Sequence, residues 1–334
     1  MPTPTNIGGK NVKRKNFKNN KKVWANKIWW YYSYTVYHGG PDSICLLYIL
    51  NELKEKLNFN IVVAHINHMI RENAILDEKY VEEICKKLDI KCFIKREDVI
   101  KNAKQNKIST EEAGRNVRYT FFEEVLNTTN SNKIATAHNS NDNAETVLLN
   151  MVRGTGISGL KGIEPTRNNK YIRPLIEINR KEIEEYCIQN NLNPRHDESN
   201  DENIYTRNKI RNGLIPHIKK EFNPNVISSI NRLSELAYDE DLYFNEIIEK
   251  IYNEISTLEC TLNLKKFNDL HLVIKRRIIL YTINRLIGNT TGIEKIHIED
   301  IIKLCDSNIG NKYLTPRKHI KVLICKGMVK FEKL

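Results

Sequence analysis

The chain has 334 residues, of which 40% are hydrophobic and 28% charged, a composition typical of a globular protein long enough for two domains. It has no apolar run long enough to cross a membrane, and its seven cysteines form no Cys-x-x-Cys pair, so we expect a cytoplasmic protein with free thiols rather than zinc sites, iron–sulfur clusters or disulfides. The net charge of +12 indicates a nucleic-acid partner only weakly, because residues 1–41 contain eight basic and no acidic residues.

The first residues differ in character from the rest of the chain. Residues 1–22 are rich in Asn and Lys, which is typical of a solvated tail and less often of a basic RNA-binding arm. Residues 23–37 are aromatic and favour a strand, yet they lack the Val/Ile run of a central parallel strand. We therefore expect residues 1–36 to be a basic, aromatic segment that is disordered or not native to the protein.

The turn at residues 39–43 opens the first predicted helix, over residues 43–57. Its two glycines allow the backbone to approach a ligand closely, Pro41 fixes the turn, and Asp42 or Ser43 can cap the helix. Because the N–H groups and dipole at a helix N-terminus attract anions, the turn suits a phosphate as well as an ordinary cap. It is not a Walker loop, since no Gly-Lys-Ser/Thr follows.

Strands and helices alternate after this helix. Short apolar runs predict strands at 60–66, 91–95, 133–137 and 171–175, and helical spacing or capping pairs predict helices at 73–88, 110–126, 142–152 and 179–190. This order predicts a parallel sheet covered on both faces, with ligands bound beyond the carboxyl ends of the strands. Helical periodicity at 225–252 and 270–287, followed by a strand pair within 312–332, predicts a second, mostly helical domain.

Two polar motifs lie in the middle of the predicted sheet domain. His65 and His68, with Arg71, suit a nucleotide-facing loop or an incidental polar loop, and they offer no third metal ligand in the sequence. Arg115 and Arg118 lie one turn apart on a predicted helix, where they either pair with nearby glutamates or face an anionic ligand.

The most informative motif follows the strand predicted at 133–137 and contains Asp142 and Glu145. The two carboxylates suit either a helix cap or a Mg²⁺ ion that is also held by phosphates. The glycine-rich stretch at 153–162 suits a mobile lid or a plain linker. Arg207 and Arg211 share one helical face, where they are either solvated surface charges or residues that bind a polyanion such as RNA.

Taken together, these motifs resemble one family. Seven motifs occur between residues 38 and 216 in the order seen in the tRNA(Ile)-lysidine synthases: Gly-Gly-Pro-Asp-Ser, His-x-x-His-x-x-Arg, Glu-x-Ala-Gly-Arg-x-x-Arg-Tyr, Ala-His-x-x-x-Asp-x-x-Glu-Thr, Arg-Gly-x-Gly-x-x-Gly-Leu, Arg-Pro-Leu and Asp-x-Ser-Asn…Arg-Asn-x-Ile-Arg. The resemblance implies an α/β fold, with a parallel-sheet PP-loop (adenine nucleotide alpha hydrolase-like) domain at 37–216. A mostly helical tRNA-binding domain at 217–334 follows, and a further C-terminal domain is missing.

The resemblance also implies an activity, which is ATP-dependent ligation of lysine to C2 of the wobble cytidine (position 34) in tRNA(Ile) with anticodon CAU. The reaction passes through an adenylated tRNA and forms lysidine. The implied cofactors are ATP and Mg²⁺. The implied partners are this tRNA and free L-lysine, without a membrane, and a homodimer is one option for assembly.

By the same resemblance the site residues fall into three groups. The catalytic residues are Asp42, Asp142 and Glu145, and Asp142 is also the candidate Mg²⁺ ligand. The residues that bind ATP are His38, Gly39, Gly40, Pro41, Asp42, Ser43, His68, Arg71 and Arg115. The residues that bind RNA or the adenylated intermediate are Arg173, Arg207 and Arg211.

Departures from the family pattern leave alternatives open. His38 stands where the family has Ser, and Asn141 and Asn143 stand where it usually has acidic residues or Gln. The composition also changes abruptly near residue 37. Together with His38, this change suggests the hypothesis that the first ~37 residues come from out-of-frame translation or a wrong start. The alternative functions are an inactive relative that only binds tRNA, and another PP-loop ligase that modifies tRNA. Thiolation enzymes of this kind commonly need paired cysteines, which this sequence lacks.

Overall fold

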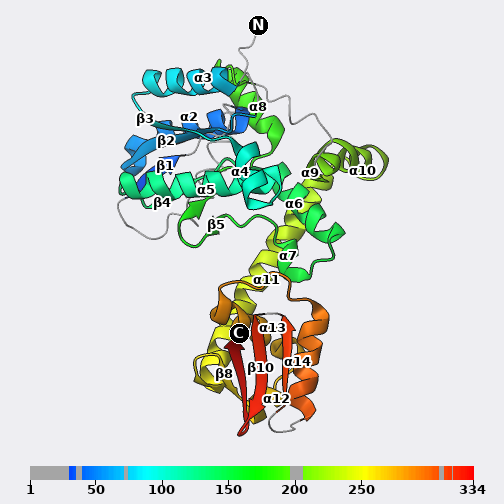
Figure 1. The fold of residues 1–334 in the computed structure, drawn as a ribbon. Coiled ribbons are helices and arrows are strands. Elements are labelled where there is room, and N and C mark those ends of the chain that lie inside the picture. The colour runs from blue at the N-terminus through cyan, green and yellow to red at the C-terminus, as the bar shows by residue number, and fades with distance from the viewer. Residues whose placement is uncertain (1–29, 35–39, 71–73, 196–205, 308–311, 318) are drawn as a thin grey trace. The chain divides into compact units, whose positions relative to one another are not determined.

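A computed structural model describes residues 30–34, 40–70, 74–195, 206–307, 312–317 and 319–334. The chain divides into two compact units, Met1–Tyr238 and Asp239–Leu334 (Figure 1). The division falls inside one long helix, α11 (Val226–Ile255). None of the helices in the described part is long and apolar enough to cross a membrane.

The first unit is built on a six-stranded sheet in the order β3-β2-β1-β4-β6-β5. Its strands are β1 (Trp30–Tyr34), β2 (Phe59–Asn67), β3 (Lys91–Arg96), β4 (Lys133–Ala135), β5 (Thr166–Arg167) and β6 (Tyr171–Ile172). All neighbouring pairs are parallel except β5 with β6. The predicted α/β class and its four strands are confirmed, although β4 and β6 are shorter than expected.

The central strand β1 corrects one sequence expectation. The aromatic stretch that lacks a Val/Ile run pairs with β2 on one side and β4 on the other, with Tyr32 opposite both Ile61 and Lys133. Parallel pairing uses main-chain N–H and C=O groups, which every residue except proline supplies, so an aromatic sequence can take this place. The rest of the N-terminal segment, 1–29 and 35–39, lies outside the described residues.

Helices cover both faces of this sheet. They are α2 (Pro41–Leu57), α3 (Ala74–Lys87), α4 (Val99–Asn106), α5 (Thr110–Thr128), α6 (Ser140–Val152), α7 (Ile157–Leu160) and α8 (Arg180–Gln189). Alternate residues of β2 point to opposite faces, so Val63 joins the core formed with α2, α3 and α8, whereas Ile66 joins the core formed with α5. Both cores are dry and apolar, which leaves the polar motifs at the ends of the strands.

A continuous helical run precedes α11 and is separated from it by a turn at residues 222–225. It begins with α9 (Thr206–Lys209), passes through one π-helical turn, η2 (Ile210–Leu214), and continues as α10 (Ile215–Glu221). In the π-turn the N–H of Ile215 donates to the carbonyl of Ile210, five residues earlier. Leu148 of α6 packs against Ile210, Ile215 and Val226, which anchors this run on α6.

The second unit combines helices with an antiparallel sheet in the order β7-β8-β11-β10-β9. Its elements after α11 are β7 (Ser256–Leu258), β8 (Thr261–Asn263), α12 (Leu264–Asn268), α13 (Leu272–Ile287), α14 (Lys295–Ser307), β9 (Tyr313–Arg317), β10 (Ile320–Cys325) and β11 (Met328–Lys333). Instead of the expected strand pair, β9, β10 and β11 form a three-stranded meander. The short hairpin β7–β8 extends this sheet by pairing β8 with β11. Strands of three residues, as in β7 and β8, are too short to show a sequence period.

Candidate active site

Helix α2 begins directly at the predicted phosphate turn. Pro41 occupies its first turn and Gly40 precedes it with φ −70°, which is ordinary extended backbone rather than a glycine-only conformation. A Cβ at Gly40 would meet no heavy atom of the described chain within 4 Å, so there is open space beside the first turn. The N-terminus of this 17-residue helix suits an anion. His38 and Gly39 lie outside the described residues.

Asp42 connects this helix to two distant segments. Its Oδ1 accepts a hydrogen bond of 3.0 Å from Nδ2 of Asn139, and its Oδ2 pairs with Nη1 of Arg180 at 2.7 Å. Burial raises the pKa of Asp42 to about 6, although the charge of Arg180 opposes this shift. Asp42 is therefore the carboxyl group of this site whose pKa lies close to neutral pH.

The N-terminus of α6 starts earlier than the sequence pattern suggests. Asn139 is the cap: its Oδ1 accepts from the N–H groups of Asn141 (2.9 Å) and Asp142 (3.1 Å), and Oδ2 of Asp142 accepts from the N–H of Asn139 (3.0 Å). This is a capping box with Asp142 as its third helical residue, so the expectation that Asp142 itself caps the helix is wrong. Asn is as good a cap as Asp, so sequence preference does not separate the two.

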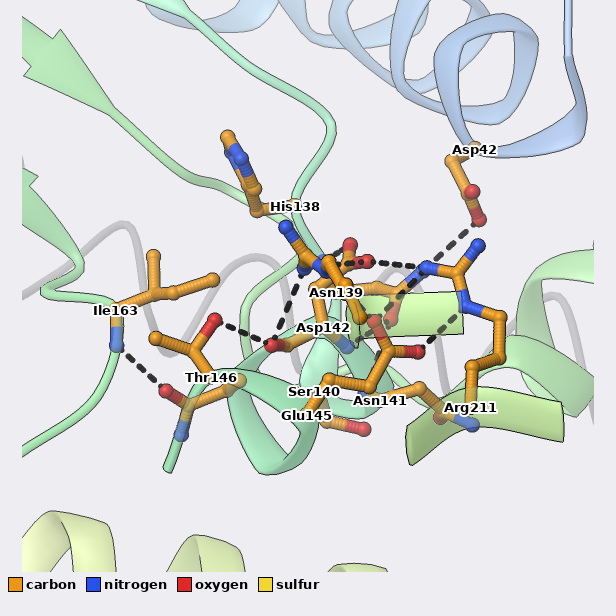
Figure 2. Close-up of polar contacts among 12 residues, drawn as sticks. Asp42, His138, Asn139, Ser140, Asn141, Asp142, Glu145, Thr146, Ile163 and Arg211 are labelled. Carbon is orange, nitrogen blue, oxygen red and sulfur yellow. Dashed lines mark hydrogen bonds and ion pairs between the residues drawn. The ribbon is translucent and has the colours of Figure 1, made fainter. Parts of the chain in front are cut away.

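Asp142 and Glu145 meet Arg207 and Arg211 in one charge cluster, of which Figure 2 labels Asp142, Glu145 and Arg211. Nε of Arg207 lies 2.8 Å from Oε2 of Glu145, and Nε of Arg211 lies 2.7 Å from Oε1. Both guanidinium groups also reach Oδ1 of Asp142, at 3.2 and 3.1 Å. Glu145 is only 2% exposed, whereas each arginine side chain is 32% exposed. We call these four residues the carboxylate–arginine cluster.

The carboxylate–arginine cluster keeps the Asp142 carboxylate ionised. Burial disfavours the charge on Asp142, but the charges of Arg207 and Arg211 and the hydrogen bond from the N–H of Asn139 outweigh burial and lower its pKa. For His138, burial is the larger effect and lowers the pKa to about 3, so its imidazole is neutral at physiological pH. Nδ1 of that imidazole lies 2.9 Å from Oγ1 of Thr136.

The carboxylate–arginine cluster does not fit a resident magnesium ion as it stands. The oxygens of Asp142 and Glu145 already accept hydrogen bonds from guanidinium groups or from the N–H of Asn139. Among the residues that the structure describes, no group of three His, Cys, Asp or Glu side chains could hold a metal. A hard cation needs several free oxygens, and those oxygens are engaged here.

Of the remaining predicted residues, His68 packs beside α5 and Arg115 belongs to that helix. His65 lies inside β2 rather than after it, and His68 follows the strand with its pKa lowered to about 4 by burial and by Arg118. A Cβ at Gly114 would lie 3.7 Å from the His68 ring, an ordinary van der Waals contact, so α5 packs beside this ring without requiring a glycine. Arg71 lies outside the described residues.

Arg115 and Arg173 both lie near Tyr119. The guanidinium of Arg115 lies 5.0 Å from the Tyr119 ring centre, and Arg167 lies 5.2 Å from the same ring. Arg173 is buried at 7% exposure, and its Nη1 donates to the carbonyl of Glu164. Arg173 therefore ties β6 to the preceding loop, and a contact with RNA stays a prediction for it.

The glycine-rich stretch makes defined hydrogen bonds, and its role as a mobile lid or a plain linker stays a prediction. It contains the helical turn α7, and Nδ2 of Asn150 donates to the carbonyl of Gly159 at 2.8 Å. Oδ1 of Asn143 accepts the N–H of Ile163 at 2.6 Å. Gly162 has φ +61°, and a Cβ there would lie 2.1 Å from that oxygen, so this position requires glycine.

Asn143 is used as an amide, and Asn141 is used as a hydrogen-bond acceptor. Nδ2 of Asn143 donates to Asn231 (2.8 Å) and Ser234 (3.0 Å), and an aspartate could not donate to either. Oδ1 of Asn141 accepts the N–H of Arg180 at 3.1 Å. The two departures from the family pattern are therefore built into the local structure rather than left as defects.

Sequence reasoning missed two residues of the site, Asn139 and Arg180. Arg180 reaches a residue 138 positions earlier, and no sequence signal marks that contact. Asn139 could have been found, because an Asn three residues before an Asp is itself a capping-box pattern.

Comparisons with known proteins agree on the fold and the relatives. A family described as a PP-loop domain matches residues 34–218. A tRNA(Ile)-lysidine synthase of Clostridium perfringens is 46% identical over 278 residues, which is 82% of this chain and 59% of that protein. The corresponding synthase of Clostridioides difficile is 44% identical over 289 residues, 85% of this chain and 63% of that protein. The chain thus spans about three fifths of the length of these curated relatives.

A solved structure supports the fold alone. The U34-tRNA thiolase of Methanococcus maripaludis aligns with a TM-score of 0.56 at 20% identity, covering 69% of this chain and 78% of that one. At this identity the likeness concerns the backbone arrangement, not the chemistry.

Proposed function

The chain belongs to the PP-loop family, and from this premise we propose that it acts as a tRNA(Ile)-lysidine synthase. It would use ATP to adenylate O2 of the wobble cytidine (position 34) in tRNA(Ile) with anticodon CAU, releasing diphosphate. Free L-lysine would then attack C2 through its amine, with AMP as the leaving group. The lysidine formed changes the codon read from AUG to AUA.

One observation carries this proposal: a single side chain joins the phosphate turn to the carboxylate–arginine cluster. Asn139 donates to Asp42 at the start of α2 and also caps the helix that bears Asp142 and Glu145. An anion-binding helix end and a pair of carboxylates therefore share one site. A ligase that joins a nucleotide-activated base to a cationic amino acid needs both features together.

The chemistry follows from the charges. The wobble cytidine carbonyl is a poor electrophile, and adenylation supplies a leaving group. Phosphate charge that develops on ATP is stabilised by the N-terminus of α2, and ATP would enter as its magnesium complex, with its own phosphates as the main ligands of the ion. Asp42, with a pKa of about 6, is the carboxylate best matched to accept a proton near neutral pH.

Lysine binding would have to compete with the protein's own arginines. Asp142 and Glu145 are neutralised by Arg207 and Arg211 in the chain without ligand. A lysine ammonium that takes one of these carboxylates releases a guanidinium, and that guanidinium is then free to bind a phosphate. This exchange would link lysine binding to the anionic groups of the adenylated tRNA.

The test is diphosphate release by the full chain with CAU-anticodon tRNA(Ile), ATP and lysine. We expect multiple turnovers only with lysine present, and lysidine in the product tRNA by mass spectrometry. A tRNA whose wobble cytidine is replaced by uridine is the matched substrate control, and Asp42→Asn is the matched inactive variant. Tight tRNA binding without diphosphate release would favour an inactive relative. Release that depends on another nucleophile would favour another PP-loop ligase.

A further inference from the structure

Asn143 stands between the two carboxylates of the carboxylate–arginine cluster along α6, and its oxygen and both of its amide hydrogens are used. Its Oδ1 accepts the N–H of Ile163 at 2.6 Å, and its Nδ2 donates to Oδ1 of Asn231 (2.8 Å) and Oγ of Ser234 (3.0 Å). The side chain is only 6% exposed. A buried amide that is matched in this way holds its partners in one arrangement, because a displacement leaves a buried polar group without a hydrogen bond.

Asn231 and Ser234 belong to the part of α11 that lies in the first unit, and both extend this set of contacts. Oγ of Ser234, which is 3% exposed, donates to the carbonyl of Lys161 at 2.8 Å. Nδ2 of Asn231 donates to the carbonyl of Ser140 at 2.9 Å. Helix α11 is therefore tied both to the first residue of α6 and to the segment after α7. We call these three side chains, Asn143, Asn231 and Ser234, the α6–α11 polar network.

The apolar contact between α6 and α11 does not fix their register by itself. Leu148 of α6 and Val226 of α11 belong to one apolar cluster, and Ile227 and Ile230 pack against it. Burial of apolar surface is non-directional, so it tolerates a shift of one helix along another. Hydrogen bonds of 2.6–3.0 Å do not tolerate such a shift, because a displacement of about 1 Å breaks them. Fixing a register is the best-attested use of buried polar groups, and the α6–α11 polar network suits it.

Helix α6 is thus held at two sets of positions. At Asn143 and Val147, one turn apart, Gly162 approaches so closely that a Cβ there would lie 2.1 Å from Oδ1 of Asn143 and 2.9 Å from Cγ2 of Val147. At Asp142 and Glu145, the same helix meets the arginines of the carboxylate–arginine cluster. Because the two sets alternate along one rigid helix, a rotation or shift of α6 at Asn143 also displaces both carboxylates.

We propose that Asn231 and Ser234 are positioning residues for the ligase, which fix the register of α6 and with it the place of Asp142 and Glu145. The proposal rests on the proposed function, in which these carboxylates meet the lysine substrate. The hydrogen bonds of Asn231 and Ser234 go to Asn143 and to main-chain carbonyls, so the two residues act on the carboxylates through α6. Such placement matters for the rate, because a misplacement of about 1 Å can cost about 100-fold.

The test uses Ser234→Ala, Asn231→Ala and the double variant of the full chain. The matched control is Ser228→Ala, an exposed serine of the same helix whose Oγ accepts from Nη1 of Arg232 at 3.2 Å. Thermal unfolding confirms that each variant folds. The first readout is the kcat and KM of diphosphate release with CAU-anticodon tRNA(Ile), ATP and lysine. The second is the NMR resonances of the Nε–H groups in the carboxylate–arginine cluster, which report on the contacts with Glu145.

We expect Ser234→Ala and Asn231→Ala each to lower kcat roughly 10-fold, to leave the KM for ATP within about 2-fold and to shift the Nε–H resonances, whereas Ser228→Ala changes none of these. The double variant should be little slower than either single variant, because both residues act through one network. Lower stability with unchanged kcat and unchanged resonances would overturn the proposal, since the network would then be purely structural. A wild type without turnover would refute the proposed function instead, and the Nε–H resonances would still decide whether the network positions the carboxylates.

Discussion

Replacing Glu145 by Gln should destabilise the first unit more than its single charge suggests. The carboxylate accepts hydrogen bonds from Nε of Arg207 (2.8 Å) and from Nε and Nη2 of Arg211 (2.7 and 2.9 Å). Gln keeps one acceptor oxygen, but its NH₂ group is a donor. It would face a guanidinium, which also only donates hydrogen bonds, so that contact would be lost. The variant therefore keeps the shape of the side chain and removes the charge that balances two arginines.

The magnitude follows from burial. Removing one partner of a fully buried ion pair costs about 3–5 kcal/mol. Glu145 is 2% exposed, but the two arginine side chains are 32% exposed. Hydration of the two guanidinium groups therefore offsets part of the free energy lost with the ion pair. We expect a decrease of about 2–3 kcal/mol in the free energy of unfolding, or about 5–10 °C in Tm. The control is Glu184→Gln, whose carboxylate pairs with Arg180 at 2.9 Å but is 53% exposed, for which we expect at most about 1 kcal/mol.

The assay is urea unfolding followed by circular dichroism of the helices, to which α2 to α8 of the first unit contribute. The midpoint should fall in Glu145→Gln while the dependence on urea keeps its slope. If Glu145→Gln and Glu184→Gln have the same midpoint, the carboxylate–arginine cluster contributes no more than a surface pair and the reasoning fails.

Three further outcomes test the site. The pKa of Asp42 is raised to about 6, so its contribution to the free energy of unfolding is present at pH 4 and lost as the pH rises through 6. Asp42→Asn should remove this pH dependence in urea titrations at pH 5 and 7.5. A parallel pH dependence in the wild type and the variant would contradict the prediction. Gly162→Ala should lower the free energy of unfolding by about 3 kcal/mol, because φ is +61° and the Cβ would clash with Asn143. Gly154→Ala, with φ +82° and open space around the Cβ, should lower it by only about 1–2 kcal/mol. Equal urea midpoints of the two variants would argue against the clash. His138 should show a flat imidazole NMR shift from pH 5 to 8, because burial lowers its pKa to about 3, and an inflection near 6.5 would disprove the burial argument.

The layered architecture of the first unit could be predicted from sequence because its signals are local. Apolar runs, such as the one that became β2 (Phe59–Asn67), mark strands buried on both faces, and capping pairs mark helix starts. The central place of β1 could not be predicted, because that place depends on main-chain pairing with β2 and β4, not on side-chain type. Helix α14 was missed although its Ile298, Ile301 and Ile302 have helical spacing.

The candidate site was predictable in its residues but not in its pairings. Asp142, Glu145, Arg207 and Arg211 all stand out in the sequence, and each allowed more than one role. Their mutual contacts join positions more than 60 residues apart, and only the folded chain decides that the carboxylates meet arginines instead of leaving oxygens open for a cation. Asn143 shows the same limit, because its two donor bonds depend on α11, which begins at Val226.

The π-turn η2 lets its segment change in length without turning the helix on either side of it. A π-turn contains one residue more than an α-turn, so residues 210–214 hold one extra residue inside the helix. Because the wider turn already absorbs that residue, deleting it would restore an α-helix and keep Arg207 directed toward Glu145, whereas a deletion from a regular α-helix rotates the flanking parts by about 100°. Substitution at Gly213 is also mild, since a Cβ there would meet nothing within 4 Å. Libraries of variants in this segment should therefore accept many residue types and tolerate the loss of one residue.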